Sequence, residues 1–239
     1  DVAHPFLGDF PSELQNPELF EVWLKNKDND SVQLIYEMSI QEFLGPNTFK
    51  IKEGENYSIR VKTPWGAEAF SNAIIPDSFD AQTIVKIDSL VTDSNWVKYT
   101  VEVEITDNAG AQNYYAVSGN FTWSYSEGIA DPIITFGTMD LEPGTEILLS
   151  DDGIQCKKIV YRFYKWLNKK NDQPLIATVK VKNVNKDYYL YHRSLIEAGV
   201  NIFGSGLGIP VSDVYTNVIG GFGVFCGSIL ISDTQYFYQ

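Results

Sequence analysis

Strict alternation of apolar and polar residues is the feature that most constrains how this chain can fold. Residues 97–106 alternate in this way, and residues 57–62 and 177–182 repeat the pattern. Because successive side chains of a strand point to opposite faces, this period predicts antiparallel strands with one buried face. Turn-forming residues separate such segments, at 52–55, 64–66, 107–110, 142–144 and 151–153. Many short strands between close turns predict an all-β sandwich or barrel rather than an α/β fold.

A break in periodicity at residues 74–80, which include Pro76, predicts a boundary between two domains. We therefore expect a two-domain β-sandwich protein. Residues 1–78 would form a small N-terminal β-sandwich, and residues 79–239 a larger C-terminal β domain with one packed helix near 185–198.

The helix prediction rests on its ends and on one apolar face. Asn185 can cap the first turn, and Gly199 can end the helix. Apolar and aromatic residues recur on one face, which predicts a stripe packed into the core. These residues are Tyr188, Tyr189, Tyr191, Leu195 and Ile196.

The end of the chain has a distinctive sequence pattern. Residues 210–227 run from a proline into Asn217, the pair Gly220-Gly221 and Gly223. Glycines tolerate a left-handed backbone and close approach of neighbouring chain. This pattern predicts a tight turn followed by a close-packed final strand.

Charge excludes some partners. The formal net charge is −13 at pH 7, which argues against general affinity for nucleic acid or anionic lipid. Half of the 18 basic residues nevertheless fall within residues 157–186. Two interpretations stay open, a solvated strand face or a patch for an acidic partner or lipid phosphates. No apolar run approaches the roughly 20 residues that a membrane helix needs.

The residues that catalysis needs are scarce. The only histidines are His4 and His192, and no Gly-x-Ser-x-Gly sequence is present. The glycine-rich residues 204–208 follow a helix instead of opening one, so they are interpreted as a connector and not as a phosphate loop. We expect no enzymatic activity and no cofactor.

Aromatic residues on strands are the speculative ligand-binding candidates. Trp123 and Tyr125 share one strand face, where they either stack on a sugar or belong to the core. Arg162, Tyr164 and Trp166 share one face of another strand, and aromatic and basic residues on both of its faces suggest that it is not plain core.

Metal and disulfide signals are weak. Asp151 and Asp152 form a weak candidate for calcium, which prefers carboxylate oxygens, but a hairpin turn explains them equally well. Residues Asp28, Asn29 and Asp30 form a poorer calcium candidate that a turn also explains, and no other metal site is predicted. Cys156 and Cys226 are the two cysteines, and their spacing leaves open whether they pair.

Several motifs, in order, resemble one family. They are Gly54-x-x-Tyr57-x-Ile59-x-Val61, Asp107 to Tyr115 with its Asn113-Tyr114-Tyr115, the Asp151-Asp152 turn, the tyrosine-rich helix, and Asn217-x-x-Gly220-Gly221-x-Gly223-x-Phe225. In this order they are similar to the Bacteroidetes outer-membrane lipoprotein family known as domain of unknown function 4249. The resemblance spans nearly the whole chain.

The resemblance implies where the protein works and with what partner. It implies a transthyretin-like or immunoglobulin-like first domain whose first strand precedes Asp1, and a lipid anchor on a segment absent from this sequence. It further implies a non-enzymatic cell-envelope protein beside a TonB-dependent outer-membrane receptor, in nutrient binding or uptake. Two alternatives remain: a carbohydrate-binding module or adhesin, and a purely structural surface protein.

Overall fold

The computed structural model describes residues 16–88, 96–106, 112–125, 133–138, 146–150, 158–168, 173–205 and 214–236. Its chain contacts divide into two compact units. Unit 1 comprises residues 1–77 and 184–229, and unit 2 comprises residues 78–183 and 230–239. Almost all of the described elements are antiparallel strands, so the fold is all-β as predicted.

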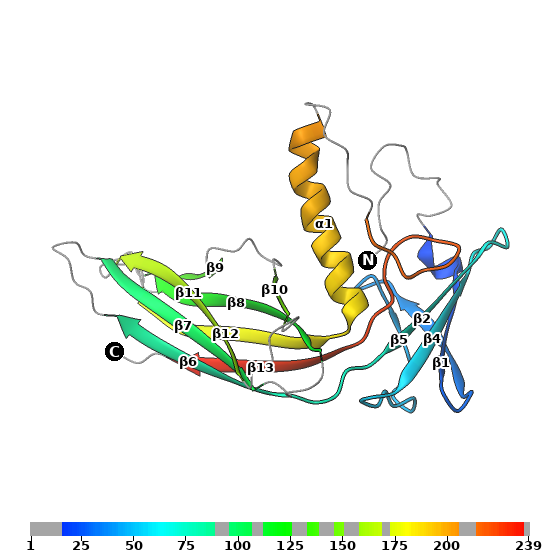
Figure 1. Cartoon of the computed structure of the whole chain (residues 1–239), viewed down its shortest axis with the longest axis horizontal. Coiled ribbons are helices and arrows are strands. Elements are labelled where there is room, and N and C mark those ends of the chain that lie inside the picture. Colours follow the sequence, from blue (N-terminus) through cyan, green and yellow to red (C-terminus); the bar gives the residue numbers. More distant parts are fainter. Residues whose placement is uncertain are drawn as a thin grey trace. The chain divides into compact units, whose positions relative to one another are not determined.

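Unit 1 is built on a five-stranded sheet with the order β3-β2-β1-β4-β5 (Figure 1). A short 3-10 helix, η2 (Pro17–Leu19), precedes it. The strands are β1 (Glu21–Asn26), β2 (Ser31–Glu37), β3 (Glu42–Leu44), β4 (Asn56–Lys62) and β5 (Glu68–Ile74). The period-2 prediction for residues 57–62 is therefore confirmed in β4.

Tight turns join these strands as their sequences suggest. Gly66 lies at φ +89° in the turn between β4 and β5, and Gly54 lies at φ +68° before β4. Asn29 adopts φ +68° between β1 and β2, where Asn26 and Asp30 exchange hydrogen bonds. Asparagine tolerates this left-handed conformation better than most residues. The predicted turns at 52–55 and 64–66 are confirmed.

The inner face of the unit 1 sheet carries its core. Val22, Tyr57, Ser71 and Ala73 are buried there. The Tyr57 hydroxyl accepts a hydrogen bond from the Lys52 N–H at 2.9 Å, so this phenol keeps a polar partner inside the sheet.

The helix α1 (Lys186–Ser205) belongs to unit 1, whereas the sequence placed it in the domain after residue 78. Asn185 caps it as predicted, because its Oδ1 accepts the Tyr188 N–H at 3.0 Å. The helix continues through Gly199 to Ser205, so the predicted end is wrong. A glycine inside a helix costs only about 1 kcal/mol relative to alanine, and without a left-handed turn it does not stop a helix.

The predicted apolar stripe of α1 is only partly buried. Tyr188, Tyr189 and Tyr191 are half-buried, but Leu195 and Ile196 are exposed. The prediction that the whole stripe is core is therefore wrong for its C-terminal part.

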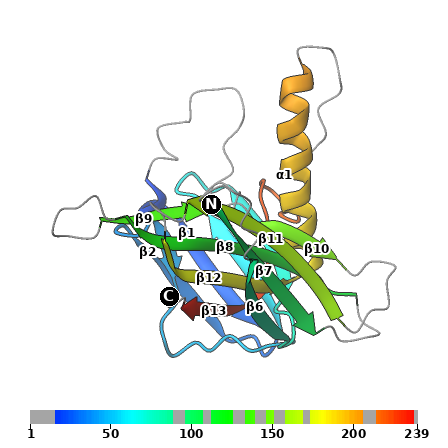
Figure 2. The ribbon, with the colours of Figure 1, turned by 90° about the vertical axis from the view of Figure 1, so that its left-hand side faces the viewer.

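Unit 2 contains two antiparallel sheets, which can be followed in Figure 2. One has the order β10-β8-β12-β13 with β9 also paired to β8, and the other has the order β11-β7-β6. The strands are β6 (Asp80–Asp88), β7 (Trp96–Thr106), β8 (Tyr114–Tyr125), β9 (Ile133–Thr138), β10 (Ile147–Ser150), β11 (Lys158–Asn168), β12 (Gln173–Val184) and β13 (Ser228–Tyr236). The predicted strands at 97–106 and 177–182 are confirmed in β7 and β12.

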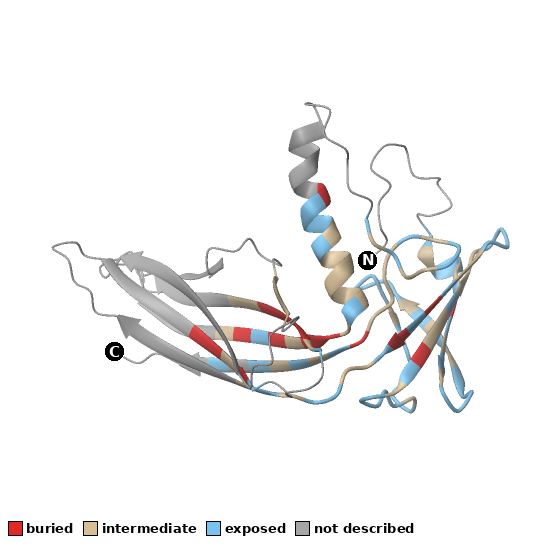
Figure 3. Cartoon of the chain, viewed as in Figure 1, coloured by how far each residue is buried: buried red, intermediate tan, exposed pale blue. Residues whose placement is uncertain are grey.

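Most buried residues of each unit lie along its strands, and Ala198 on α1 is buried as well (Figure 3). Among the described residues of unit 2, the largest fully buried side chains are Val103, Ile105, Tyr115, Val117 and Val179. Glu102 is buried as well, although alternation predicts that it faces solvent. It lies in the middle strand of its sheet, in register with Arg162 of β11.

Candidate functional site

Five exposed residues form one continuous row across the outer face of the unit 1 sheet. Trp23 pairs in register with Gln33 on one side and with Arg60 on the other. Arg60 pairs with Phe70, and Phe70 pairs with Ile219 from the end of the chain. Directly opposed residues point to the same face of a sheet. We call Gln33, Trp23, Arg60, Phe70 and Ile219 the aromatic row.

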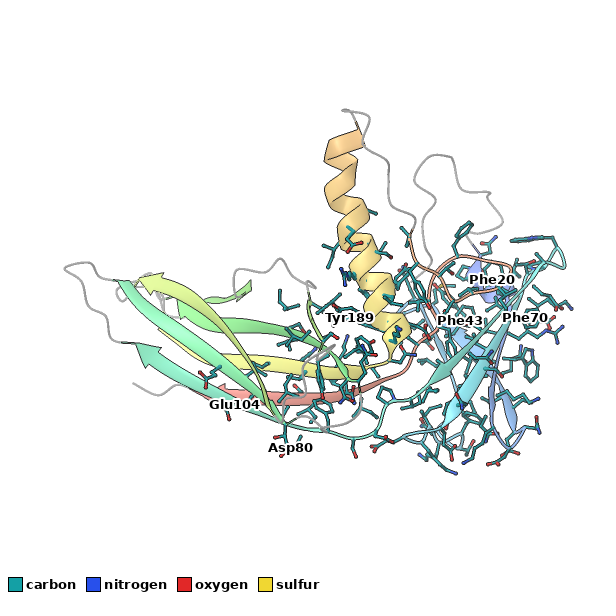
Figure 4. All side chains as sticks on the ribbon, in the orientation of Figure 1. Phe20, Phe43, Phe70, Asp80, Glu104 and Tyr189 are labelled. Carbon is teal, nitrogen blue, oxygen red and sulfur yellow. The ribbon has the colours of Figure 1, made fainter. Side chains whose placement is uncertain are left out.

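The apolar members of the aromatic row are open to solvent. Trp23 is 38% exposed, Phe70 42% and Ile219 75%. Figure 4 shows the side chains of this unit and labels Phe70 on β5. Exposed aromatic residues that gather on one face of a folded protein mark a candidate interaction surface.

The cation in the middle of the row is held in place. The Arg60 Nη2 atom donates to Glu68 Oε1 at 2.5 Å, and the Arg60 Cζ atom lies 5.8 Å from the centre of the Phe70 ring. The hydrogen bond and charge of Glu68 raise the pKa of the Arg60 guanidinium above its usual value. Arg60 therefore stays charged and is oriented against the Phe70 ring.

Polar residues border the aromatic row on both sides. On β1, β4 and β5, the outward-facing neighbours two positions away are all polar: Glu21, Lys25, Ser58, Lys62, Glu68 and Asn72. Lys62 and Glu21 form an ion pair at 3.8 Å. Across these three strands the aromatic strip is consequently one residue wide. At the β2 end the strip is wider, because exposed Ile35, two positions from Gln33, pairs with exposed Leu44.

The end of unit 1 runs along the edge strand β5. We call residues 214–227 the C-terminal strap, drawn in orange to red in Figure 1. Phe70 and Ile219 exchange two backbone hydrogen bonds of 2.9 and 2.8 Å, and Ser71 Oγ donates to the Asn217 carbonyl at 2.9 Å. The strap thus gives part of the β5 edge hydrogen-bond partners, which protects it from pairing with other chains.

Side chains brace the turn of the strap. Asn217 Nδ2 donates to the Phe225 carbonyl at 2.8 Å, while Asn217 Oδ1 accepts the Phe225 N–H at 2.9 Å. Thr216 Oγ1 donates to the Gly223 carbonyl at 2.8 Å. The side-chain amide of Asn217 therefore makes the two hydrogen bonds to Phe225 that a paired backbone residue would make. These bonds join the two sides of the turn.

Glycine is required where the strap meets the sheet. Gly220 has φ +81°, and a Cβ atom there would lie 2.4 Å from the Glu68 carbonyl oxygen. At Gly227 a Cβ atom would lie 2.7 Å from the Ile74 carbonyl oxygen. The sequence correctly predicted a tight, close-packed turn, but the final strand begins at Ser228, after the motif and not within it.

The strap is also tied to α1. The Tyr215 hydroxyl donates to Asp187 Oδ1 at 2.5 Å, and the Tyr215 N–H donates to Ser194 Oγ at 2.8 Å. The bond to Asp187, together with partial burial and the aspartate charge, raises the pKa of Tyr215 to about 12. The phenol therefore remains a hydrogen-bond donor throughout the physiological range.

Phe222 projects from the turn of the strap. It is 87% exposed, the largest exposed fraction among the large hydrophobic residues that the structure describes. Gly221 precedes it, and Gly223 follows at φ +112°. An apolar ring held in water by a braced turn is a second candidate contact point, distinct from the aromatic row.

The residues proposed from the sequence as binding candidates lie elsewhere. Trp123 and Tyr125 lie in β8, in register with Thr135 and Ile133 of β9. Arg162, Tyr164 and Trp166 lie in β11, in the other sheet of unit 2. The strands are confirmed, but these five side chains fall outside the described part of the structure, as do Asp151 and Asp152.

Parts of the other sequence predictions can be placed. Of the basic stretch, Lys182 forms an ion pair with Glu146 at 2.5 Å, and Lys180 and Lys186 are exposed. Cys226 is half-buried, and Cys156 lies outside the described residues. His192 lies against two rings of its own helix, with centroids 4.1 Å from Tyr188 and 5.4 Å from Tyr191.

Neither a metal-binding cluster nor a membrane-spanning helix occurs among the described residues. No group of three or more His, Cys, Asp or Glu side chains there is arranged to hold a metal ion. No helix within the described ranges combines the length and apolar character that crossing a membrane requires.

The aromatic row was not among the sites predicted from the sequence, although a signal was present. Val22, Trp23 and Leu24 are consecutive, so an inward Val22 and Leu24 require an outward Trp23. What no single strand could reveal is the register that aligns Trp23 with Arg60 and Phe70.

Comparison with known proteins identifies the family. The sequence matches the family described as "Domain of unknown function (DUF4249)" over residues 10–229. No curated protein matches the chain. Among solved structures, the putative ApaA protein from Bordetella pertussis matches 44% of this chain and 78% of its own, with 15% identity and a TM-score of 0.22. A TM-score this low supports no argument about fold or function. The family match covers most of the sequence, and the chain belongs to the DUF4249 family.

Proposed function

We propose that this protein is a non-enzymatic protein of the cell envelope. In this proposal a lipid on a preceding segment anchors it to the outer membrane, where it works beside a TonB-dependent receptor in nutrient binding or uptake. The motif resemblance supports this role, and the exposed Phe222 at the turn of the C-terminal strap is the structural observation that carries it.

Phe222 has the properties of an anchor for a protein partner. Aromatic side chains that enter a pocket of the partner contribute most of the affinity at many interfaces. The bonds of Asn217 and Thr216 already order the turn, so little conformational entropy is lost when it docks. A receptor surface with an apolar pocket is the occupant that such a turn fits.

The test is a pull-down from native outer membranes, with the full-length lipidated protein as bait. We expect one β-barrel receptor to co-purify at a fixed ratio. Phe222→Ser removes the anchor but leaves the braced backbone, so recovery of the barrel should fall by about tenfold or more.

Trp65→Ser is the matched control. Trp65 is also an exposed aromatic residue of unit 1, lying in the turn between β4 and β5 and outside the strap, where its ring contacts Phe20. It should leave recovery of the barrel unchanged. Absence of any barrel with the wild-type bait would remove the receptor-linked function, and equal losses for both variants would remove Phe222 as the anchor.

The aromatic row favours a second candidate function, carbohydrate binding. A binding module of this kind requires exposed aromatic residues on one sheet face, and Trp23 and Phe70 meet that requirement. Binding of oligosaccharides to the purified protein, measured by calorimetry, separates this candidate from receptor docking alone.

A further inference from the structure

We propose that the aromatic row of unit 1 is a binding site for a single extended chain of a neutral, β-linked oligosaccharide. This inference develops the carbohydrate-binding candidate and is independent of whether the strap docks to a receptor. Four features support it: the width of the row, its length, its charge balance and the chemistry that alternates along it.

The width of the row suits a linear polymer better than a protein surface. Polar rows run in register along both of its sides, Lys25, Ser58 and Asn72 on one side and Glu21, Lys62 and Glu68 on the other. A stable protein interface buries about 800 Å² on each partner around a contiguous apolar centre. A strip that is one residue wide across β1, β4 and β5 and widens only at β2, with Ile35 and Leu44, does not supply such a centre. A second copy of this chain is therefore not the occupant that it favours.

The length of the row suits several sugar units. Five chain segments lie side by side, and neighbouring strands are about 4.8 Å apart, so the row spans roughly 19 Å. Trp23 and Phe70 are separated by two such intervals, about 10 Å. This separation is comparable to that of alternate rings in an extended β-linked glycan, so each aromatic ring can meet the flat face of one sugar.

The charges around the row favour a neutral ligand. Glu68 is bonded to Arg60, and Glu21 is paired with Lys62. These two acid–base pairs cancel, and Lys25 adds one positive charge beside the row. The site therefore offers no strong excess of charge of either sign for a charged polymer. The formal charge of −13 for the whole chain further opposes anionic ligands.

Along the row, stacking and hydrogen-bonding groups alternate. Gln33, Trp23, Arg60 and Phe70 present an amide, an indole, a guanidinium and a phenyl ring in turn. Sugars combine flat C–H faces, which stack on aromatic rings, with hydroxyl groups that need donors and acceptors. The bond to Glu68 uses one of the five N–H donors of Arg60, so a fixed guanidinium can still donate to hydroxyls between the two rings.

The test is isothermal calorimetry on the whole chain with defined hexasaccharides as probes. The panel holds cellohexaose, xylohexaose and mannohexaose, with maltohexaose as an α-linked probe and hexagalacturonate as an anionic probe. We expect at least one neutral β-linked hexasaccharide to bind, more tightly than the α-linked and anionic probes.

Variants then locate the site. Trp23→Ala and Phe70→Ala should each weaken that binding by about tenfold or more. Phe70→Leu keeps an apolar side chain and removes only the ring. It should weaken hexasaccharide binding in the same way, and it replaces Phe70→Ala if that variant impairs folding. Trp65→Ala and Phe222→Ala remove exposed aromatic residues outside the row and should leave the affinity unchanged.

Three results would overturn the inference. One is the absence of binding by every neutral β-linked probe at millimolar concentration. Another is binding that survives both Trp23→Ala and Phe70→Ala. The third is self-association in solution that Trp23→Ala abolishes, which would make the row an interface between copies. If a barrel still co-purifies with the wild-type bait in any of these cases, receptor docking stands and only the saccharide site falls.

Discussion

Gly220 shows how one residue couples the C-terminal strap to the sheet. Its left-handed backbone and its approach to the Glu68 carbonyl both demand the absence of a side chain. The sequence indicated a tight turn here, because a Gly-Gly pair follows an extended segment. It could not indicate the partner of the turn, since Glu68 lies about 150 residues earlier in the chain.

We predict that Gly220→Ala is much more destabilising than Gly66→Ala. Both glycines have positive φ, but a Cβ atom at Gly66 meets nothing within 4 Å, whereas at Gly220 it meets backbone. Conformational strain alone should cost Gly66→Ala about 1–2 kcal/mol, and the added clash should bring Gly220→Ala to about 3 kcal/mol or more.

The measurement for this pair is urea unfolding followed by circular dichroism. The difference between the two variants isolates the contact with Glu68 from the cost of the left-handed backbone. Equal shifts of the unfolding midpoint would contradict the close packing of the strap on β5.

The proposed role of Trp23 depends on the residues that lie beside it in the sheet. By itself it is an outward tryptophan in a strand, and single exposed apolar residues need no explanation. Register with Arg60 and Phe70 makes it part of a row. The sequence-based candidates Trp123 and Tyr125 rested on the same strand logic, and their surface role stays a prediction.

At the scale of elements, the strap and α1 support each other. Tyr215 bonds to Asp187 and Ser194 on the first turns of the helix, and the Asn185 N–H donates to the Gly227 carbonyl. Hydrogen bonds from both ends of the strap therefore hold the N-terminal part of the helix in place. The sequence predicted the helix and its Asn185 cap from local chemistry, but its length and its strap contacts depend on tertiary structure.

We predict a loss of stability at alkaline pH that is specific to Tyr215. Its pKa is about 12 in the folded state, against the ordinary value of 10.0. Between these values the unfolded chain has released the phenolic proton and the folded chain still holds it. The free energy of unfolding consequently decreases as pH rises from 10 to 12, whereas below pH 10 this contribution is fully present.

Tyr215→Phe is the control for that prediction, because it removes the titrating group and keeps the ring. Urea midpoints of both proteins should be compared between pH 9 and 12, since the other tyrosines titrate in both. We expect the advantage of the wild type over the variant to shrink across this range. A constant difference would show that the bond to Asp187 does not contribute to stability.

At the scale of the whole molecule, the chain leaves its first unit and returns to it. Residues 1–77 and 184–229 form unit 1, while residues 78–183 and 230–239 form unit 2. A boundary at the proline-containing segment 74–80 is visible in the sequence as a break in periodicity. The return of the helix and strap to unit 1 has no such local signal.

We predict that residues 1–78 alone do not form a stable domain. Without the strap, the β5 edge loses its bonds with Ile219 and Asn217, and an unprotected edge promotes aggregation. The fragment should show poor dispersion of its amide resonances. The same fragment joined to residues 184–229 by a flexible linker should recover dispersed resonances. A cooperative unfolding transition of the short fragment with the stability of the linked one would contradict this.

Local chemistry determined part of the secondary structure of this protein. Period-2 alternation specified β4, β7 and part of β12, glycine specified the turns at residues 54 and 66, and Asn185 specified the start of α1, because each depends on residues close together in the chain. Tertiary structure alone decided the register that builds the aromatic row and the docking of the strap on β5. Both depend on hydrogen bonds between residues far apart in sequence, which no local period encodes.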